Sequence, residues 1–135
     1  MTTIKPTGSV RTNDAFRAGE KLGQDVRKLD TNHDGVVTQG DLKRNAKKLG
    51  FSSAETKAIS TLLAETPRWK GGRSLFGATV EAIYGGSHVA SLDTKDTGTV
   101  SAKQLNVLKK STDKNAYAIA ADVFEYTQSV EKAAK

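Results

Sequence analysis

The sequence predicts an all-α protein in which most of the chain folds as one helical domain. Two observations carry this prediction. Apolar residues recur at the three- and four-residue spacing of helix faces along most of the chain, and residues that start or stop helices separate these stretches. A chain of 135 residues is long enough for one domain with a real core. We expect a flexible N-terminal tail over residues 1–12 and a single domain over residues 13–135.

Composition narrows the functional classes. The absence of cysteine excludes disulfides, thiolate metal sites and thiol nucleophiles. No apolar run approaches the roughly 18 residues of a membrane span, and the N-terminus has no apolar leader core, so we expect a soluble, cytoplasmic protein. Export without a cleaved leader is left open. The net charge of +6 favours either an anionic partner or plain solubility.

The first two expected helices flank an acidic segment. The first begins at Asn13, and residues at helical spacing give it one face: Phe16, Gly19, Gly23, Val26 and Leu29. The second begins near Thr38, where Thr38 and Asp41 have the spacing of a capping box. Its apolar stripe consists of Leu42, Ala46 and Leu49, and it stops at Gly50.

Further helices are expected after Gly50, including a short one through Leu105 and Leu108 to Lys109–Lys110. Ser52 and Glu55 form a capping box that opens a helix ending at Thr66–Pro67. A basic glycine turn follows over residues 68–73; we interpret it as a connection, with an anion site as the alternative. The next apolar stripe runs from Leu75 to Tyr84 and is broken at Gly85–Gly86. A last helix, at about 113–132, carries a broad apolar stripe typical of a core.

The acidic segment, Asp30 to Asp41, has oxygen donors at regular positions. These are the side chains of Asp30, Asn32, Asp34 and Asp41, the backbone carbonyl of Val36, and the hydroxyl of Thr38 or a water that it holds. Gly35 stands at the sharpest turn, which needs a positive φ. Three carboxylates on so short a segment repel one another, and a hard divalent cation resolves that conflict.

This segment resembles the twelve-residue loop of an EF-hand, with the first hand at about 14–49. The resemblance implies Ca²⁺ as the ligand and a fold built on a pair of hands, with additional helices between and after them. The family's last ligand is usually Glu, whereas here it is the shorter Asp41, which implies weaker Ca²⁺ binding and leaves Mg²⁺ possible at the same site. The alternative is a generic Asn/Asp/Gly turn between two helices.

A second segment, residues 93–104, aligns with the first position by position. Gly98 matches Gly35 and Val100 matches Val37, but the ligand positions have decayed to Asp93, Lys95, Thr97, Thr99 and Gln104. A Lys ammonium at a ligand position repels a cation, so we expect this loop to hold no ion. We interpret residues 87–110 as a degenerate hand and residues 51–86 as a helical insertion. The resemblance implies that Val37 and Val100 pair as a two-strand bridge between the loops.

Two functions compete at this stage. The first is a Ca²⁺-binding regulator or adaptor with one working site, or an ion-stabilised interaction module. Its protein partner would be a particular one, because the only methionine is Met1 and a Met-rich adaptable groove is therefore absent. The second is a module that binds an anion or acidic partner through the basic cluster Lys43, Arg44, Lys47 and Lys48, with the hand as scaffold. Further cations that could extend this cluster are Arg68, Lys70, Arg73, Lys109 and Lys110.

Other classes are less well supported. Nucleic acid is a weaker choice of partner because the few aromatic residues are not interleaved with the cations. An enzyme is not expected, because the sequence shows no set of nucleophile, base and orienting residue.

Overall fold

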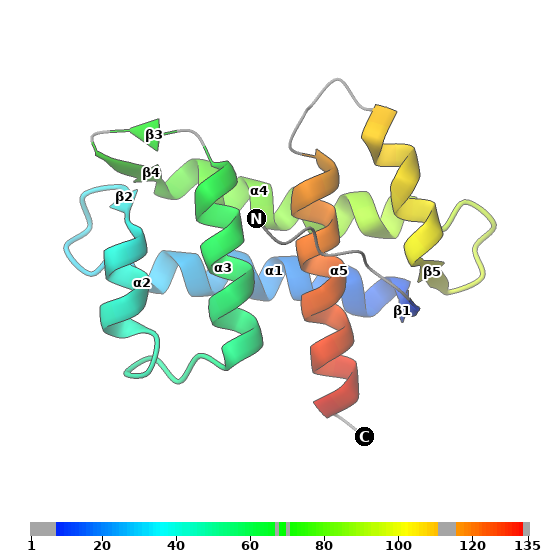
Figure 1. Ribbon diagram of the computed structural model, residues 1–135, viewed down its shortest axis with the longest axis horizontal. Helices are drawn as coiled ribbons and strands as arrows, with labels where there is room; N and C mark the ends of the chain where they lie inside the picture. The colour runs from blue at the N-terminus through cyan, green and yellow to red at the C-terminus, as the bar shows by residue number, and fades with distance from the viewer. Residues whose placement is uncertain (1–7, 67, 70, 111–115, 134–135) are drawn as a thin grey trace.

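The computed structural model describes residues 8–66, 68–69, 71–110 and 116–133, and it is mostly helical (Figure 1). In chain order the elements are β1 (Ser9–Arg11), α1 (Thr12–Lys28), β2 (Val36–Val37), α2 (Gln39–Asn45), α3 (Ser53–Glu65), β3 (Arg68–Trp69), β4 (Gly72–Ser74), α4 (Leu75–Ser91), β5 (Thr99–Ser101), the 3₁₀ helix η1 (Ala102–Lys110) and α5 (Ala116–Ala133). The expectation of a largely helical fold is confirmed. No helix in the described part of the chain is long and apolar enough to cross a membrane.

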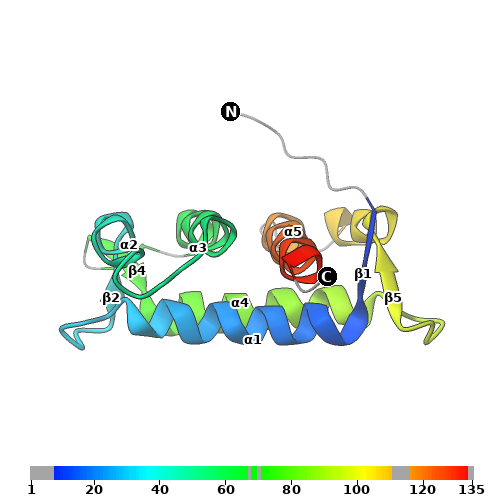
Figure 2. The ribbon, with the colours of Figure 1, turned by 90° about the horizontal axis from the view of Figure 1, so that it is seen from below.

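The helices form two layers. The long helices α1 and α4 lie side by side in one layer, and α2, α3, α5 and η1 lie on one side of it (Figure 2). The two long helices run antiparallel, since Gly19 of α1 lies against Gly86 of α4 whereas Gly23 lies against Thr79 and Ile83.

Glycine permits the close approach of α1 to α4. A Cβ atom added at Gly19 would lie 2.7 Å from the carbonyl oxygen of Ala82, and one added at Gly86 would lie 2.8 Å from that of Ala15. The predicted break at Gly85–Gly86 is therefore wrong: α4 continues through these glycines to Ser91. They serve close helix packing, which overrides their weak helix propensity.

The second half of the chain repeats the first at a constant offset. The first residues of α1 and α4, Thr12 and Leu75, lie 63 positions apart, as do the first residues of α2 and η1, Gln39 and Ala102. The boundary expected at residue 86 does not match the structure, because α4 runs from Leu75 to Ser91 and is preceded by the strand β4. Helix α3 completes the first repeat, and β4 with α4 opens the second. The sequence showed the two matching loops but not the short strands that precede α1 and α4.

The short strands join the two repeats crosswise. Strand β1, which precedes α1, pairs with β5 of the second loop, and β4, which precedes α4, pairs with β2 of the first. The two loops lie at opposite ends of the molecule (Figure 2). The expected bridge between Val37 and Val100 is wrong: Val37 stands opposite Arg73, and Val100 stands opposite Val10.

Two other expected segments also contain strands. Residues 9–11, assigned to the flexible tail, form β1, and α1 already begins at Thr12. Val10 is only 2% exposed, so its burial offsets the entropy of ordering this segment. Residues 1–7 of the expected tail lie outside the described residues. The basic glycine turn is the hairpin of β3 and β4.

Each loop is anchored in its own apolar cluster. Leu29, Val37 and Leu42 around the first loop belong to one buried cluster, which also includes Ile59 and Leu63 of α3. Their counterparts around the second loop are Leu92, Val100 and Leu105, in a second cluster with Phe124 of α5. The expected core stripe of α5 is buried over most of its length, whereas Val130 is 46% exposed.

Candidate functional site

The first loop, residues 30–41 and hereafter loop 1, turns around the carboxylate of Asp30. This side chain is buried, and its two oxygens accept hydrogen bonds from the backbone N–H groups of Asp34 at 3.2 Å and Gly35 at 2.9 Å. The chain reverses through left-handed conformations at His33 (φ 57°) and Gly35 (φ 79°). The predicted glycine turn is present, and Asp30 occupies its centre.

The other two early oxygen donors of loop 1 lie on its exposed rim. Asp34 Oδ1 accepts the backbone N–H of Val36 at 3.0 Å, and Asn32 Nδ2 donates to Asp34 Oδ2 at 3.2 Å. The bond from the Val36 N–H holds the pKa of Asp34 below its usual value, helped by Asp30 and Asn32. Asp34 is thus held in its anionic form.

The last donor of loop 1, Asp41, is engaged by its own helix. Its Oδ2 accepts the Thr38 N–H at 3.0 Å, and the Thr38 hydroxyl accepts the Asp41 N–H at 3.0 Å, which confirms the predicted capping box. Its Oδ1 lies 2.6 Å from Nη2 of Arg44. In the described residues, no three acidic, histidine or cysteine side chains converge as a metal-binding group.

The second loop, residues 93–104 and hereafter loop 2, has the same backbone frame. Its left-handed residues are Asp96 (φ 55°) and Gly98 (φ 84°), the counterparts of His33 and Gly35. Asp93 accepts the backbone N–H groups of Thr97 and Gly98, each at 2.8 Å. The position-by-position match seen in the sequence therefore extends to backbone conformation and to the first carboxylate.

Loop 2 differs in the donors that surround its carboxylate. The Thr12 hydroxyl donates to Asp93 Oδ2 at 2.8 Å, and the Thr97 hydroxyl lies 3.1 Å from Oδ1. The Thr12 bond and the Thr97 N–H hold the pKa of Asp93 below its usual value. In loop 1 the counterparts of these two threonines are Leu75, which has no hydroxyl, and Asp34, which carries a negative charge.

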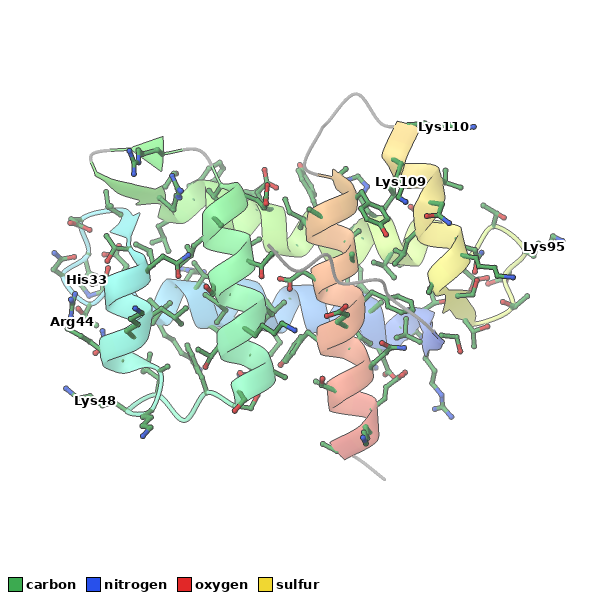
Figure 3. The ribbon with its side chains drawn as sticks, viewed as in Figure 1. His33, Arg44, Lys48, Lys95, Lys109 and Lys110 are labelled. Atoms are coloured by element: carbon green, nitrogen blue, oxygen red, sulfur yellow. The ribbon has the colours of Figure 1, made fainter. Side chains whose placement is uncertain are left out.

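Gln104 closes loop 2 with a neutral amide. Its Oε1 accepts the Ser101 N–H at 2.7 Å, and its Nε2 donates to the carbonyl oxygen of Leu92 at 2.7 Å. One side chain therefore ties the end of the loop to its beginning. Lys95 extends away from the loop into solvent (Figure 3). The loop 2 side chains predicted to lack ligand character are thus engaged in internal hydrogen bonds or point outward.

Each loop is also braced by the opposite repeat. The backbone N–H of Leu75, at the start of α4, donates to the Gly35 carbonyl at 2.9 Å. In the same way, the Thr12 N–H at the start of α1 donates to the Gly98 carbonyl at 3.0 Å. The backbone of each loop is therefore held by its first Asp and also by a backbone contact with the opposite repeat.

The sequence did not reveal that Asp25 of α1 and Glu55 of α3 lie close together. Asp25 of α1 is fully buried; its Oδ1 lies 2.8 Å from Lys21 Nζ, whereas no donor within the described residues reaches Oδ2. Burial, followed by the neighbouring Glu55 of α3, raises the pKa of Asp25 to about 6, so the two acids can share a proton. The four-residue spacing of Lys21 and Asp25 was visible in the sequence, but the contact with α3 was not.

The predicted basic cluster is present on the surface. The side chains of Lys43, Arg44, Lys47 and Lys48 are all exposed, on α2 and the turns after it. Arg44 and Lys48 lie at the loop 1 end of the molecule, far from Lys95, Lys109 and Lys110 (Figure 3). We call these four residues the basic surface.

The donor chemistry of loop 1 suits a hard cation, since carboxylate, amide and hydroxyl oxygens are the ligands that Ca²⁺ and Mg²⁺ prefer. Asp30, Asn32 and Asp34 stand close together in the turn, while Asp41 is held by Arg44. Comparisons of the chain with protein-family models, curated proteins and solved structures found no match.

Proposed function

We propose that loop 1 binds one Ca²⁺ ion and that the protein acts as an ion-dependent regulator, adaptor or ion-stabilised interaction module for a protein partner. The observation that supports this most is the contrast between Asp30 and Asp93. Each accepts two backbone N–H groups, but among the described residues only Asp93 also accepts two hydroxyl groups. Loop 1 places the carboxylate of Asp34 where loop 2 has Thr97.

A cation would relieve the repulsion that this arrangement creates. Asp30, Asn32 and Asp34 would hold the ion, with the Val36 carbonyl, Thr38 and Asp41 completing the set of oxygens. In loop 2, hydroxyl groups donate to Asp93 and the amide of Gln104 closes the loop. In loop 1, a bound Ca²⁺ would stabilise the carboxylates instead. Because the backbone frame is already fixed from β4 and α4, little conformational entropy is lost on binding. Mg²⁺ remains a competitor for the same oxygens.

The experiment is a calorimetric Ca²⁺ titration of chelator-stripped protein at physiological Mg²⁺, with Trp69 fluorescence followed in parallel. Trp69, the only tryptophan, lies in β3, which pairs with β4 beside loop 1. We expect one site. Asp34→Asn should weaken binding by about tenfold or more, because ligand charge sets affinity in such sites.

The matched control is Asp96→Asn, which removes the same charge from the exposed part of loop 2 and keeps a residue that tolerates its positive φ. It should leave the affinity within about twofold, since only screened long-range attraction changes. Absence of heat in the parent protein, or equal loss in both variants, would refute an ion site in loop 1.

A second candidate function is favoured by the basic surface. Four cations within six residues, all exposed, form a local positive field that suits an acidic protein segment. In this function loop 1 is only a scaffold. Binding that persists unchanged in the presence of a chelator and falls steeply between low and moderate salt would support it over the ion-dependent function.

A further inference from the structure

Arg44 joins the two candidate sites. Its Nη2 lies 2.6 Å from Oδ1 of Asp41, the last oxygen donor of loop 1, and its side chain is 68% exposed. Gly40 makes room for the guanidinium, since a Cβ atom at that position would lie 3.1 Å from Nη1. The same residue is therefore part of the basic surface and a partner of the loop.

This contact is particular to loop 1. The counterparts of Asp41 and Arg44 in the second repeat are Gln104, a neutral residue that bonds the backbone, and Val107, which is 64% exposed. The loop that we expect to be ion-free thus has neither the carboxylate nor the guanidinium. Arg44 is therefore found only in the repeat whose loop ends in a carboxylate that could bind an ion.

The guanidinium and a bound cation compete for Asp41. Both are positive and both require the same carboxylate, so either one weakens the attachment of the other. An exposed ion pair of this kind contributes little to stability, so Arg44 can leave Asp41 readily. Once released, it stands with Lys43, Lys47 and Lys48, which are exposed on the same short stretch.

We propose that Arg44 couples loop 1 to an acidic protein segment that binds the basic surface. The inference rests on the proposed ion site. When the ion takes Asp41, Arg44 becomes free to pair with the segment, and when the segment takes Arg44, Asp41 becomes free for the ion. Because such coupling is reciprocal, each ligand raises the affinity of the other by the same factor. An acidic segment fits better than nucleic acid because no aromatic residue lies among the four cations.

The test uses Ca²⁺ and a synthetic hexaglutamate peptide as probes. Arg44→Met, which keeps the apolar stem, should tighten Ca²⁺ binding by about threefold to fivefold, the upper part of the range for removing one exposed ion pair. In the parent protein, Ca²⁺ should strengthen peptide binding by a similar factor. This strengthening should vanish in Arg44→Met.

Lys43→Met is the matched control, because it removes one positive charge from the same surface and has no ion pair with Asp41 in the described structure. It should weaken peptide binding, leave Ca²⁺ affinity within about twofold, and preserve the Ca²⁺-dependent strengthening. Equal Ca²⁺ affinities in Arg44→Met and Lys43→Met would overturn the inference while leaving the ion site intact.

Two other outcomes are also decisive. Absence of Ca²⁺ binding in the parent and in Arg44→Met would refute the proposed ion site, and the inference with it. If a single-stranded oligonucleotide binds the basic surface and hexaglutamate does not, the assignment of an acidic protein segment is wrong.

Discussion

Loops 1 and 2 share one backbone frame and solve its electrostatic problem differently. Both turn through left-handed residues at the same two positions, both direct two N–H groups at the first Asp, and both are braced by the first residue of the opposite long helix. Loop 2 surrounds its acid with hydroxyl groups and closes with an amide. Loop 1 has the carboxylates of Asp34 and Asp41 where loop 2 has Thr97 and Gln104, and it has Leu75 in place of Thr12. The frame is therefore separable from the chemistry that it carries.

We expect the largest loss of stability from a substitution at the contact between α1 and α4. Gly19→Ala would place a Cβ atom 2.7 Å from the Ala82 carbonyl, against backbone that cannot move aside easily. We expect a loss of about 1–3 kcal/mol in the free energy of unfolding, the usual cost of overpacking. Urea unfolding measures it.

Gly23→Ala is the control in the same helix, because its Cβ atom would lie 3.4 Å from its nearest neighbours, an ordinary contact. It should be neutral or stabilising by up to about 1 kcal/mol through helix propensity. If both substitutions lower the free energy of unfolding equally, the close contact of α1 with α4 at Gly19 does not contribute specially to stability.

The repeats also differ at the position of Asp25, whose counterpart in the second repeat is His88. Burial and Glu55 raise the pKa of Asp25 from 3.8 to about 6, so the folded protein binds this proton more tightly than the unfolded chain. The stabilisation is complete below about pH 4 and is lost as the pH rises to about 6. Asp25→Asn, which resembles the protonated acid, should therefore be more stable than the parent above pH 6, by about 1–3 kcal/mol.

The measurement is the free energy of unfolding of both proteins from pH 4 to pH 8. Burial, together with Glu125, raises the pKa of Asp122 to about 8. Asp122 therefore also contributes to the pH dependence of stability, and it does so in both proteins. The difference between the two curves removes the contribution of Asp122 and reports on Asp25 together with Glu55 and Lys21, which interact with it. A difference that does not change between pH 4 and pH 7 would show that Asp25 does not titrate in this range.

The contributions of Gln104 in loop 2 and Asp41 in loop 1 to stability can be compared by replacing each with alanine. Gln104→Ala removes two hydrogen bonds and leaves the Ser101 N–H and the Leu92 carbonyl without them, so it should cost about 1–2 kcal/mol. Asp41→Ala in chelator loses a capping bond and an exposed ion pair and should cost less, about 0.5–1 kcal/mol. Thermal unfolding of both variants in chelator decides, and the reverse order would contradict the idea that Gln104 holds loop 2 closed.

The sequence predicted what depends on neighbouring residues. The capping boxes at Thr38 and Ser52 are present, and so are the glycine turns at Gly35 and Gly98, because each needs only a particular residue a few positions away. Asp30, Asn32 and Asp34 lie close together in the turn. Ion binding and the EF-hand resemblance stay predictions.

The sequence failed where two distant segments meet. Strands of two or three residues, such as β1 and β4, are too short for an alternating pattern, and nothing local shows that β4 rather than loop 2 pairs with β2. Gly85 and Gly86 of α4 resembled a helix stop in the sequence, whereas in the structure Gly85 lies against α5 and Gly86 lies against α1. The pairing of Asp25 with Glu55 likewise depends on the packing of α3 against α1.

The smallest expected effect concerns the Thr12 hydroxyl, which loop 1 lacks because its counterpart is Leu75. Thr12→Val keeps the shape and removes the bond to Asp93, so the pKa of Asp93 should rise toward its usual value of 3.8. A lowered pKa stabilises the fold above the unfolded-state pKa and loses its effect as the pH falls through the folded one. The variant should therefore be slightly less stable than the parent at pH 7 and equal to it at low pH.

An NMR titration of the Asp93 carboxyl carbon in both proteins measures the change in pKa. An unchanged pKa would mean that the backbone N–H groups alone stabilise the charge of Asp93. Loops 1 and 2 would then differ less around their first acid than the hydroxyl contacts indicate.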